Sequence, residues 1–424
     1  MYKKYLLDNG LTVLLVPNST SQAVLVDAFV KTGSRNENER IQGISHFLEH
    51  LNFKGTNKYP TTKKINEVID NIGGDLNANT SNEFTQFMAL VPAKHIAKAF
   101  DVVTELTLYP TFKPVEIERE KGVIIEEINM YLDSPAKYAG FLLEEGMWNN
   151  HSFGRNVLGT PETIRAMTRV DIVEYRNQFY VPENIVLAIA GNFDEKVVKS
   201  LVDSYWRKIK SNGFSHSTVP ASSAKQIPLI QQTRDTSQAH WGLGFRSYNI
   251  NDPKNYALDI VSAILSGGMS SRLFIEIRER RGLAYYVQAG SHAYSDTGVT
   301  MVRAGVEKGK IGEALQATVK ELNKLKKTAV SSIEMKKAKE FSKGRVALAL
   351  EDTATKLDWY LEQISFKKSV EEPEQWFKKI DNVTPQDVKR AAQEILRPEN
   401  ATLSIVGPYN SKQGKELRSL VNNL

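Results

Sequence analysis

An internal repeat constrains what this chain can fold into more than any other feature of its sequence. Residues 168–191 contain Thr-x2-Asp, then Pro-Glu-Asn and an alternating apolar run that ends in Gly, and residues 384–407 repeat this pattern. The offset is constant, since 384 − 168 = 216 and 407 − 191 = 216. A repeat at this spacing indicates two homologous halves of about equal size. A chain of 424 residues, 41% of them hydrophobic, is long enough to form two cores.

The pattern within each half predicts the fold class. In the first half, short strands are expected at 12–16 and 24–30, and helices at 60–72, 94–107 and 161–180. Strands and helices do not alternate regularly around glycine-rich phosphate loops, which argues against a doubly wound nucleotide-binding fold. We therefore predict an α+β protein with two homologous α/β-sandwich domains, each a mostly antiparallel sheet packed with helices.

A change of composition places the boundary between the predicted domains. Ser, Gly, Asn, Pro and Lys cluster between residues 209 and 226, which is typical of a linker. The predicted domains are therefore residues 1–208 and residues 227–424. Because the halves are homologous, residues that differ between them at equivalent positions can indicate which half carries the chemistry.

Two histidines and a glutamate in one short segment predict a metal site. Residues 43–55 are expected to be helical, and His46 and His50, two of the chain's seven histidines, lie four residues apart within them. Side chains at this spacing project from one helix face, so both can reach one metal ion at about 2.0–2.1 Å. Glu49 lies beside them and need not bind the ion. A carboxylate there can accept a proton from a water whose pKa the metal has lowered to about 7.

A zinc ion held by two histidines needs a third protein ligand. The chain has no cysteine, and its other histidines show no paired spacing: His95, His151, His216, His240 and His292. Segment 116–128 has apolar residues at helical spacing, among them Val123, which predicts a helix with one buried side. Glu120 and Glu127 lie seven residues apart and share one face of this helix, whereas Glu126 is rotated by about 100°. We predict Glu127 as the third ligand and Glu120 as a neighbour that tunes the site.

Together these residues resemble the signature of the pitrilysin/insulinase metallopeptidases, a family that includes the mitochondrial processing peptidases. That signature is a His-x-x-Glu-His helix followed, at a spacing close to the one found here, by a helix with Glu-x6-Glu. In this chain the gap from His50 to Glu127 is 127 − 50 = 77 residues. The resemblance implies one zinc ion per chain with the ligands His46, His50 and Glu127. It also implies Glu49 as general base and Glu120 in a supporting catalytic role.

Two further stretches resemble the family's substrate-binding elements. Residues 73–81 look like its edge strand, whose backbone pairs with an extended substrate, and this implies Asn77 and Ala78 as substrate contacts. In physical terms, a small polar run after two glycines could let a peptide add as an extra strand. Arg278 and Tyr285 resemble its Arg-x6-Tyr element, and both can donate hydrogen bonds to a peptide carbonyl or oxyanion. Taken alone, residues 73–81 would be an ordinary turn and strand. The segment that begins at Arg278 would be the basic end of a helix before a strand.

The repeat offset assigns the metal chemistry to the first half. The residues 216 positions after the five metal-site residues are, in order, Ser262, Leu265, Ser266, Lys336 and Lys343. Serine, leucine and lysine cannot replace histidine and glutamate as zinc ligands. We therefore predict a catalytic first half and a second half that contributes substrate-binding residues.

Composition narrows the expected partners and location. The net charge of +6 is spread over a large chain, and its lysine-rich runs are typical of solvated helix faces rather than of a nucleic-acid surface. No apolar run reaches the roughly 18 residues that a membrane-spanning helix needs. The strand-like residues 11–15 leave no room for a signal peptide, although a removed transit peptide would be compatible with them. The expected location is the cytoplasm, with neither nucleic acid nor membrane as a partner.

The predicted function is that of a zinc-dependent endopeptidase that hydrolyses extended or unfolded peptides. The resemblance implies that a chain with one pair of halves needs a second copy or a homologous partner chain to enclose a chamber, and a homodimer is the simpler expectation. The alternative is a non-catalytic structural or substrate-holding subunit, like those relatives whose zinc motifs are degenerate. The intact motif argues against this alternative.

Overall fold

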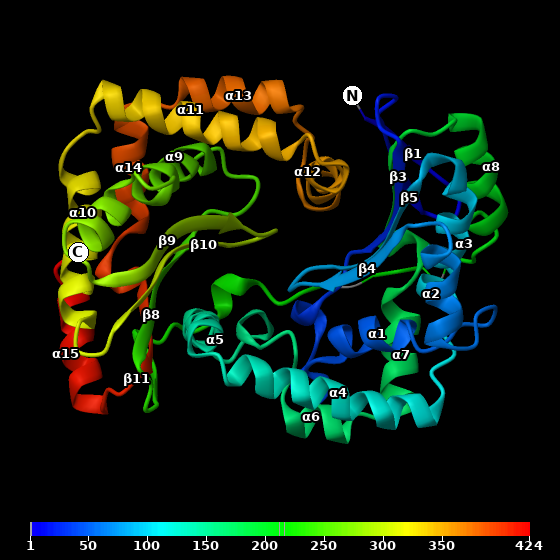
Figure 1. The fold of residues 1–424 in the computed structure, drawn as a ribbon, viewed down its shortest axis with the longest axis horizontal. Helices are drawn as coiled ribbons and strands as arrows, with labels where there is room; N and C mark the ends of the chain where they lie inside the picture. Colours follow the sequence, from blue (N-terminus) through cyan, green and yellow to red (C-terminus); the bar gives the residue numbers. More distant parts are fainter. Residues whose placement is uncertain (1, 212, 216) are drawn as a thin grey trace. The chain divides into compact units, whose positions relative to one another are not determined.

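The computed structural model describes residues 2–211, 213–215 and 217–424. The chain forms two compact units, each with one sheet (Figure 1). Unit 1 comprises Met1–Asn129, Arg155–Thr218 and Ala349–Ser365. Unit 2 comprises Met130–Gly154, Val219–Leu348 and Phe366–Leu424. Two sheets packed with helices confirm the predicted α+β class with two homologous domains.

Each unit includes a segment from the other half of the sequence. Residues 349–365 belong to unit 1, and residues 130–154 belong to unit 2. The repeat relates the two segments, since 349 − 216 = 133 and 365 − 216 = 149. The linker predicted at 209–226 stays a prediction, and Asn212 and His216 within it lie outside the described residues.

The sheet of unit 1 is mostly antiparallel. Its six strands run in the order β1-β2-β6-β3-β5-β4, and β2 with β6 is the parallel pair. β4 therefore lies at an edge. The strands are β1 Lys3–Leu6, β2 Thr12–Pro17, β3 Ala23–Val30, β4 Asp75–Thr80, β5 Thr85–Pro92 and β6 Ile185–Gly191. The strands predicted at 12–16 and 24–30 are confirmed as β2 and β3.

Helices cover this sheet and carry the residues of interest. α3 packs against β3 and β5, and α8 packs against α3 (Figure 1). The helices of unit 1 include α1 Ile44–Asn52, α2 Thr62–Asp70, α3 Ile96–Leu108, α4 Pro114–Leu132, α6 Pro161–Ala166, α7 Arg169–Phe179, α8 Glu195–Tyr205 and α12 Thr353–Phe366. The single helix predicted at 161–180 is wrong, because α6 and α7 are separate. Thr168 has extended backbone angles, and its side chain accepts the Asp171 N–H, so a new helix begins there.

Unit 2 repeats the architecture with a five-stranded sheet in the order β7-β11-β8-β10-β9. α5 packs against β8 and β11, and α9 packs against β9. The strands are β7 Leu229–Thr233, β8 Gln238–Ser247, β9 Ala284–Ala293, β10 Gly298–Glu307 and β11 Ala401–Gly407. The helices are α5 Pro135–Met147, α9 Asn255–Ser266, α10 Ile311–Lys327, α11 Ser332–Ala349, α13 Pro373–Asn382, α14 Pro385–Ile395 and α15 Ser411–Val421.

The structure confirms the sequence repeat at the level of single bonds. α7 and β6 in unit 1 correspond to α14 and β11 in unit 2. In unit 1, Asn184 Nδ2 donates to the carbonyl of Phe179 at 3.0 Å, and 216 residues later Asn400 Nδ2 donates to the carbonyl of Ile395 at 3.0 Å. The same side chain therefore closes the same helix end in both halves.

The helix start at Asp171 gives a pH-dependent prediction. Its carboxylate pairs with Arg40 at 2.6 Å and accepts hydrogen bonds from the backbone and side chain of Thr168. These contacts, of which the Arg40 contact has the largest effect, lower the pKa of Asp171 to about 2. A depressed pKa stabilises the fold above the ordinary value of 3.8, and this contribution is lost as pH falls towards 2. Asp171→Asn should lower the free energy of unfolding by about 1–2 kcal/mol at pH 7, and the loss should become smaller as the pH falls. Urea unfolding at several pH values measures this loss.

The repeat supplies a matched control for this prediction. Asp387 forms the same capping box with Thr384, but its nearest arginine contact, from Arg390, is 3.9 Å long. Asp387→Asn should therefore cost less than Asp171→Asn at pH 7. An equal cost at both sites would show that the Arg40 pair adds nothing.

Candidate metal centre

The start of α1 is fixed by a buried glutamate and a glycine. Glu37 accepts the backbone N–H of Gly43 at 2.7 Å and that of Ser45 at 2.9 Å, which places a carboxylate at the helix N-terminus. Burial raises the pKa of Glu37 to about 7, although the two N–H groups act against this shift. Ser45 Oγ also lies 2.9 Å from the hydroxyl of Tyr175 on α7. These contacts set the direction of the helix.

Gly43 is required by both its conformation and its surroundings. Its φ is +92°, and a Cβ there would lie 2.8 Å from the Gly159 Cα and the Leu158 oxygen. Gly43→Ala should therefore shift α1 and lower the unfolding free energy by about 2–4 kcal/mol, together with the zinc affinity. Gly73→Ala is the control, because Gly73 has a φ of +66° but open space around a Cβ. Equal costs in urea unfolding would mean that the close approach is unimportant.

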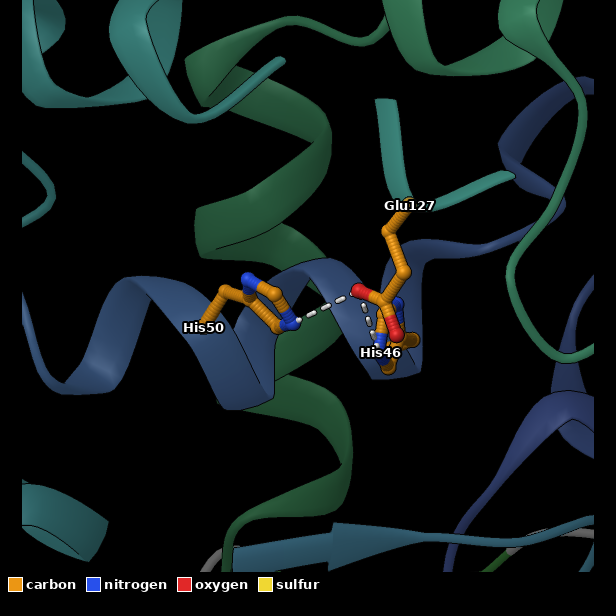
Figure 2. A group of neighbouring side chains, drawn as sticks. All are labelled: His46, His50 and Glu127. Atoms are coloured by element: carbon orange, nitrogen blue, oxygen red, sulfur yellow. Dashed lines mark ion pairs between the residues drawn. The ribbon is translucent and has the colours of Figure 1, made fainter. Parts of the chain in front are cut away.

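Three side chains meet at one point between α1 and α4 (Figure 2). His46 and His50 project from one face of α1, and Glu127 reaches them from α4. Glu127 Oε2 lies 3.7 Å from His46 Nε2 and 3.4 Å from His50 Nε2. Ligands bound at about 2.1 Å in a tetrahedron lie about 3.4 Å from one another, so these separations suit zinc. In the part of the chain that the structure describes, no other group of three such donors is found.

The surroundings of the two imidazoles suit metal ligands. Burial, with a smaller effect of His50, lowers the pKa of His46 to about 3, so its ring is neutral at physiological pH. His50 Nδ1 lies 2.8 Å from Glu120 Oε1, and an ionised carboxylate can only accept, so Nδ1 donates. The other ring nitrogen of His50, Nε2, is on the side of Glu127, where it can serve as a metal ligand. Two imidazole nitrogens, a carboxylate and an orienting second carboxylate fit a zinc site.

Lys54 is a contributor that the sequence reasoning missed. Its Nζ lies 2.6 Å from Glu120 Oε2, and Glu120 is 2% exposed. Burial acts to raise the pKa of Glu120, but hydrogen bonds from His50 and Lys54 bring it below its ordinary value. The available signal was the spacing, because Lys54 follows His50 by four residues; in the structure α1 ends at Asn52 and Lys54 lies in the turn that follows.

Glu49 lies on α1 next to the ligand group but takes no part in it. Its carboxylate is half-buried, and Oε2 accepts a hydrogen bond of 2.5 Å from Thr80 Oγ1. Like Lys54, Thr80 has no role in the sequence-based prediction. Burial raises the pKa of Glu49, and the Thr80 hydrogen bond opposes that shift. Glu126, the rejected alternative to Glu127, is exposed on α4.

The predicted substrate-binding residues are placed as follows. Asn77 and Ala78 lie in the middle of β4, where Asn77 is exposed and Ala78 is half-buried. α1 packs against β4, so this strand adjoins the metal centre. Arg278 is exposed, with its guanidinium 5.1 Å from the ring centre of Phe274, and Tyr285 on β9 is 59% exposed. Both belong to unit 2, and their role in substrate binding stays a prediction.

Comparisons with known proteins agree with one another. A family model described as "Insulinase (Peptidase family M16)" matches residues 12–161, and one described as "Peptidase M16 inactive domain" matches residues 166–341. An uncharacterized zinc protease of Bacillus subtilis is 34% identical over 360 residues, which cover 84% of this chain and 86% of that protein. Another, of Mycobacterium leprae, is 32% identical over 423 residues, covering 98% and 94%.

The fold has solved counterparts. The crystal structure of a protease from Helicobacter pylori matches with a TM-score of 0.89 and 24% identity, covering 96% of this chain and 99% of that one. At this identity the match shows a shared fold.

Proposed function

The chain belongs to the insulinase family of peptidases, and on that basis we propose that it is a zinc-dependent endopeptidase that hydrolyses extended or unfolded peptides. The observation that carries the proposal is the group of His46, His50 and Glu127, whose donor atoms lie within 4.8 Å of one another. These three residues would hold the ion. When bound, zinc lowers the pKa of a water molecule to about 7 and polarises a carbonyl.

Glu49 would be the general acid and base of the reaction. As the water oxygen bonds to the scissile carbonyl carbon, Glu49 Oε1 accepts the proton that the water loses. The same proton then passes to the amine nitrogen as the carbon–nitrogen bond breaks. Its place beside the ligands, with only Oε2 hydrogen-bonded to Thr80, supports this role. Glu120 would orient His50 through Nδ1.

The edge strand β4 would hold the substrate backbone. One side of β4 pairs with β5, and in the described part of the chain no strand pairs with its other side. An extended peptide can add at such an edge through main-chain hydrogen bonds, with Asn77 and Ala78 at the centre of the contact. In unit 2, Arg278 and Tyr285 would supply hydrogen-bond donors to the substrate.

We also propose that the chain acts with a second copy or a homologous partner, and that it works in the cytoplasm. Family membership supports the first of these proposals. Among the described residues, no helix combines the length and the hydrophobicity needed to cross a membrane.

The proposal is tested by metal content and peptide hydrolysis together. Purified protein should contain about one zinc per chain and cleave a quenched fluorescent peptide that has no fixed structure. A chelator should abolish cleavage, and added zinc should restore it. A folded protein of similar length should resist cleavage. Zinc near one per chain without cleavage at any concentration, alone or with candidate partners, would favour the alternative of a non-catalytic subunit.

A further inference from the structure

Thr80 ends the edge strand and contacts the proposed general base. It is the last residue of β4, it is half-buried, and its Oγ1 donates the 2.5 Å hydrogen bond to Glu49 Oε2. Thr80 lies on the half-buried face of the strand, whereas its neighbour Asn79 is exposed. Among the described residues, no other side chain hydrogen-bonds to the Glu49 carboxylate. The Thr80 hydroxyl is therefore the side-chain hydrogen-bond partner of this carboxylate.

The pattern of engaged and free oxygens suits proton transfer. A carboxylate that acts as a base needs one oxygen free to accept a proton. The glutamate side chain also rotates about several bonds, and this freedom must be restricted if the carboxylate is to stay in place. The Thr80 bond engages Oε2 and leaves Oε1 available. A hydrogen bond to an ionised acceptor is shorter and stronger than one between neutral groups, so it can fix the side chain.

Building on the proposed peptidase function, we infer that Thr80 is a positioning residue: it orients the Glu49 carboxylate and links it to the strand that holds the substrate. The backbone of β4 would pair with the peptide, while the Thr80 side chain on the same strand holds the base. A peptide paired with β4 would therefore lie on the strand that also holds Glu49. Substrate binding and placement of the base are thus coupled through one residue.

The first test compares two substitutions at Thr80. Thr80→Val keeps the shape of the side chain and removes the hydroxyl, and it should lower kcat by about 10–100-fold with little change in KM. Thr80→Ser keeps the hydroxyl, and its kcat should stay close to that of the wild type. Zinc content should be unchanged in both variants. A wild-type kcat in Thr80→Val, or an equal loss in Thr80→Ser, would overturn the inference.

The second test needs no catalysis. In the metal-free chain, urea unfolding of Thr80→Val, Glu49→Leu and the double variant forms a double-mutant cycle. A hydrogen bond to a charged acceptor should appear as a coupling of about tenfold or more in the folding equilibrium constant. A cycle of Asn79→Ala with Glu49→Leu should show no coupling, because Asn79 is exposed on the other strand face.

The two tests separate failure of this inference from failure of the proposed function. A wild-type chain that cleaves no peptide contradicts the peptidase proposal, while the cycle still reports on the hydrogen bond. Zero coupling between Thr80 and Glu49 overturns the positioning role whatever the activity. Coupling together with a loss of kcat in Thr80→Val alone supports it.

Discussion

Replacing Glu49 with Gln is expected to abolish peptide hydrolysis while zinc remains bound. The amide cannot accept the proton that the carboxylate takes, so kcat should fall by about 10²–10⁴-fold or more. The ligand atoms come from His46, His50 and Glu127, which the substitution does not touch. The measurements are kcat with the quenched peptide and zinc per chain by atomic emission.

The matched control is Glu126→Gln, because it makes the same chemical change at an exposed position of α4. This variant should keep both kcat and zinc. Loss of zinc from Glu49→Gln would mean that Glu49 is itself a ligand, and a wild-type kcat would remove it from the mechanism.

Replacing Glu127 with Gln is expected to release zinc. The substitution removes the only anionic ligand of the group and leaves two imidazoles, which bind zinc less well than a site with three ligands. The affinity should fall by more than the roughly 10–100-fold that loss of an outer-shell partner causes. Competition with a chromophoric chelator measures this affinity.

Two further variants define what the Glu127 result means. Glu120→Gln keeps all three ligands and should lower the zinc affinity by about 10–100-fold, because it weakens the contacts that orient His50 and hold Lys54. Glu126→Gln should leave the affinity unchanged. If Glu126→Gln releases zinc and Glu127→Gln does not, the third ligand has been assigned one residue too late.

Much of the fold and the ligand group could be predicted because they depend on regular spacing. The repeat, the alternation in β2 and β3 and the four-residue interval between His46 and His50 are periodic features that the chain keeps when it folds. Glu127 was distinguished from Glu126 by helix geometry alone, and the structure places Glu127 toward the histidines.

Features that depend on tertiary packing could not be predicted in this way. Thr80 meets Glu49 only because β4 packs beside α1, and no local pattern indicates which strand will lie there. Val123, expected on the buried side of α4, is 47% exposed. The buried side follows Ile117, Ile124 and Ile128, and Val123 is rotated away from this row by one residue. Spacing alone does not show how wide the buried stripe is.

The exchanged segments have a consequence for what either half of the sequence can form alone. Neither half of the sequence contains all of a compact unit, since unit 1 needs residues 349–365 and unit 2 needs residues 130–154. A chain that held only one half of the sequence would therefore lack a segment of its own unit. Cutting the chain in the middle would leave both units incomplete, so the two halves depend on each other to complete their folds.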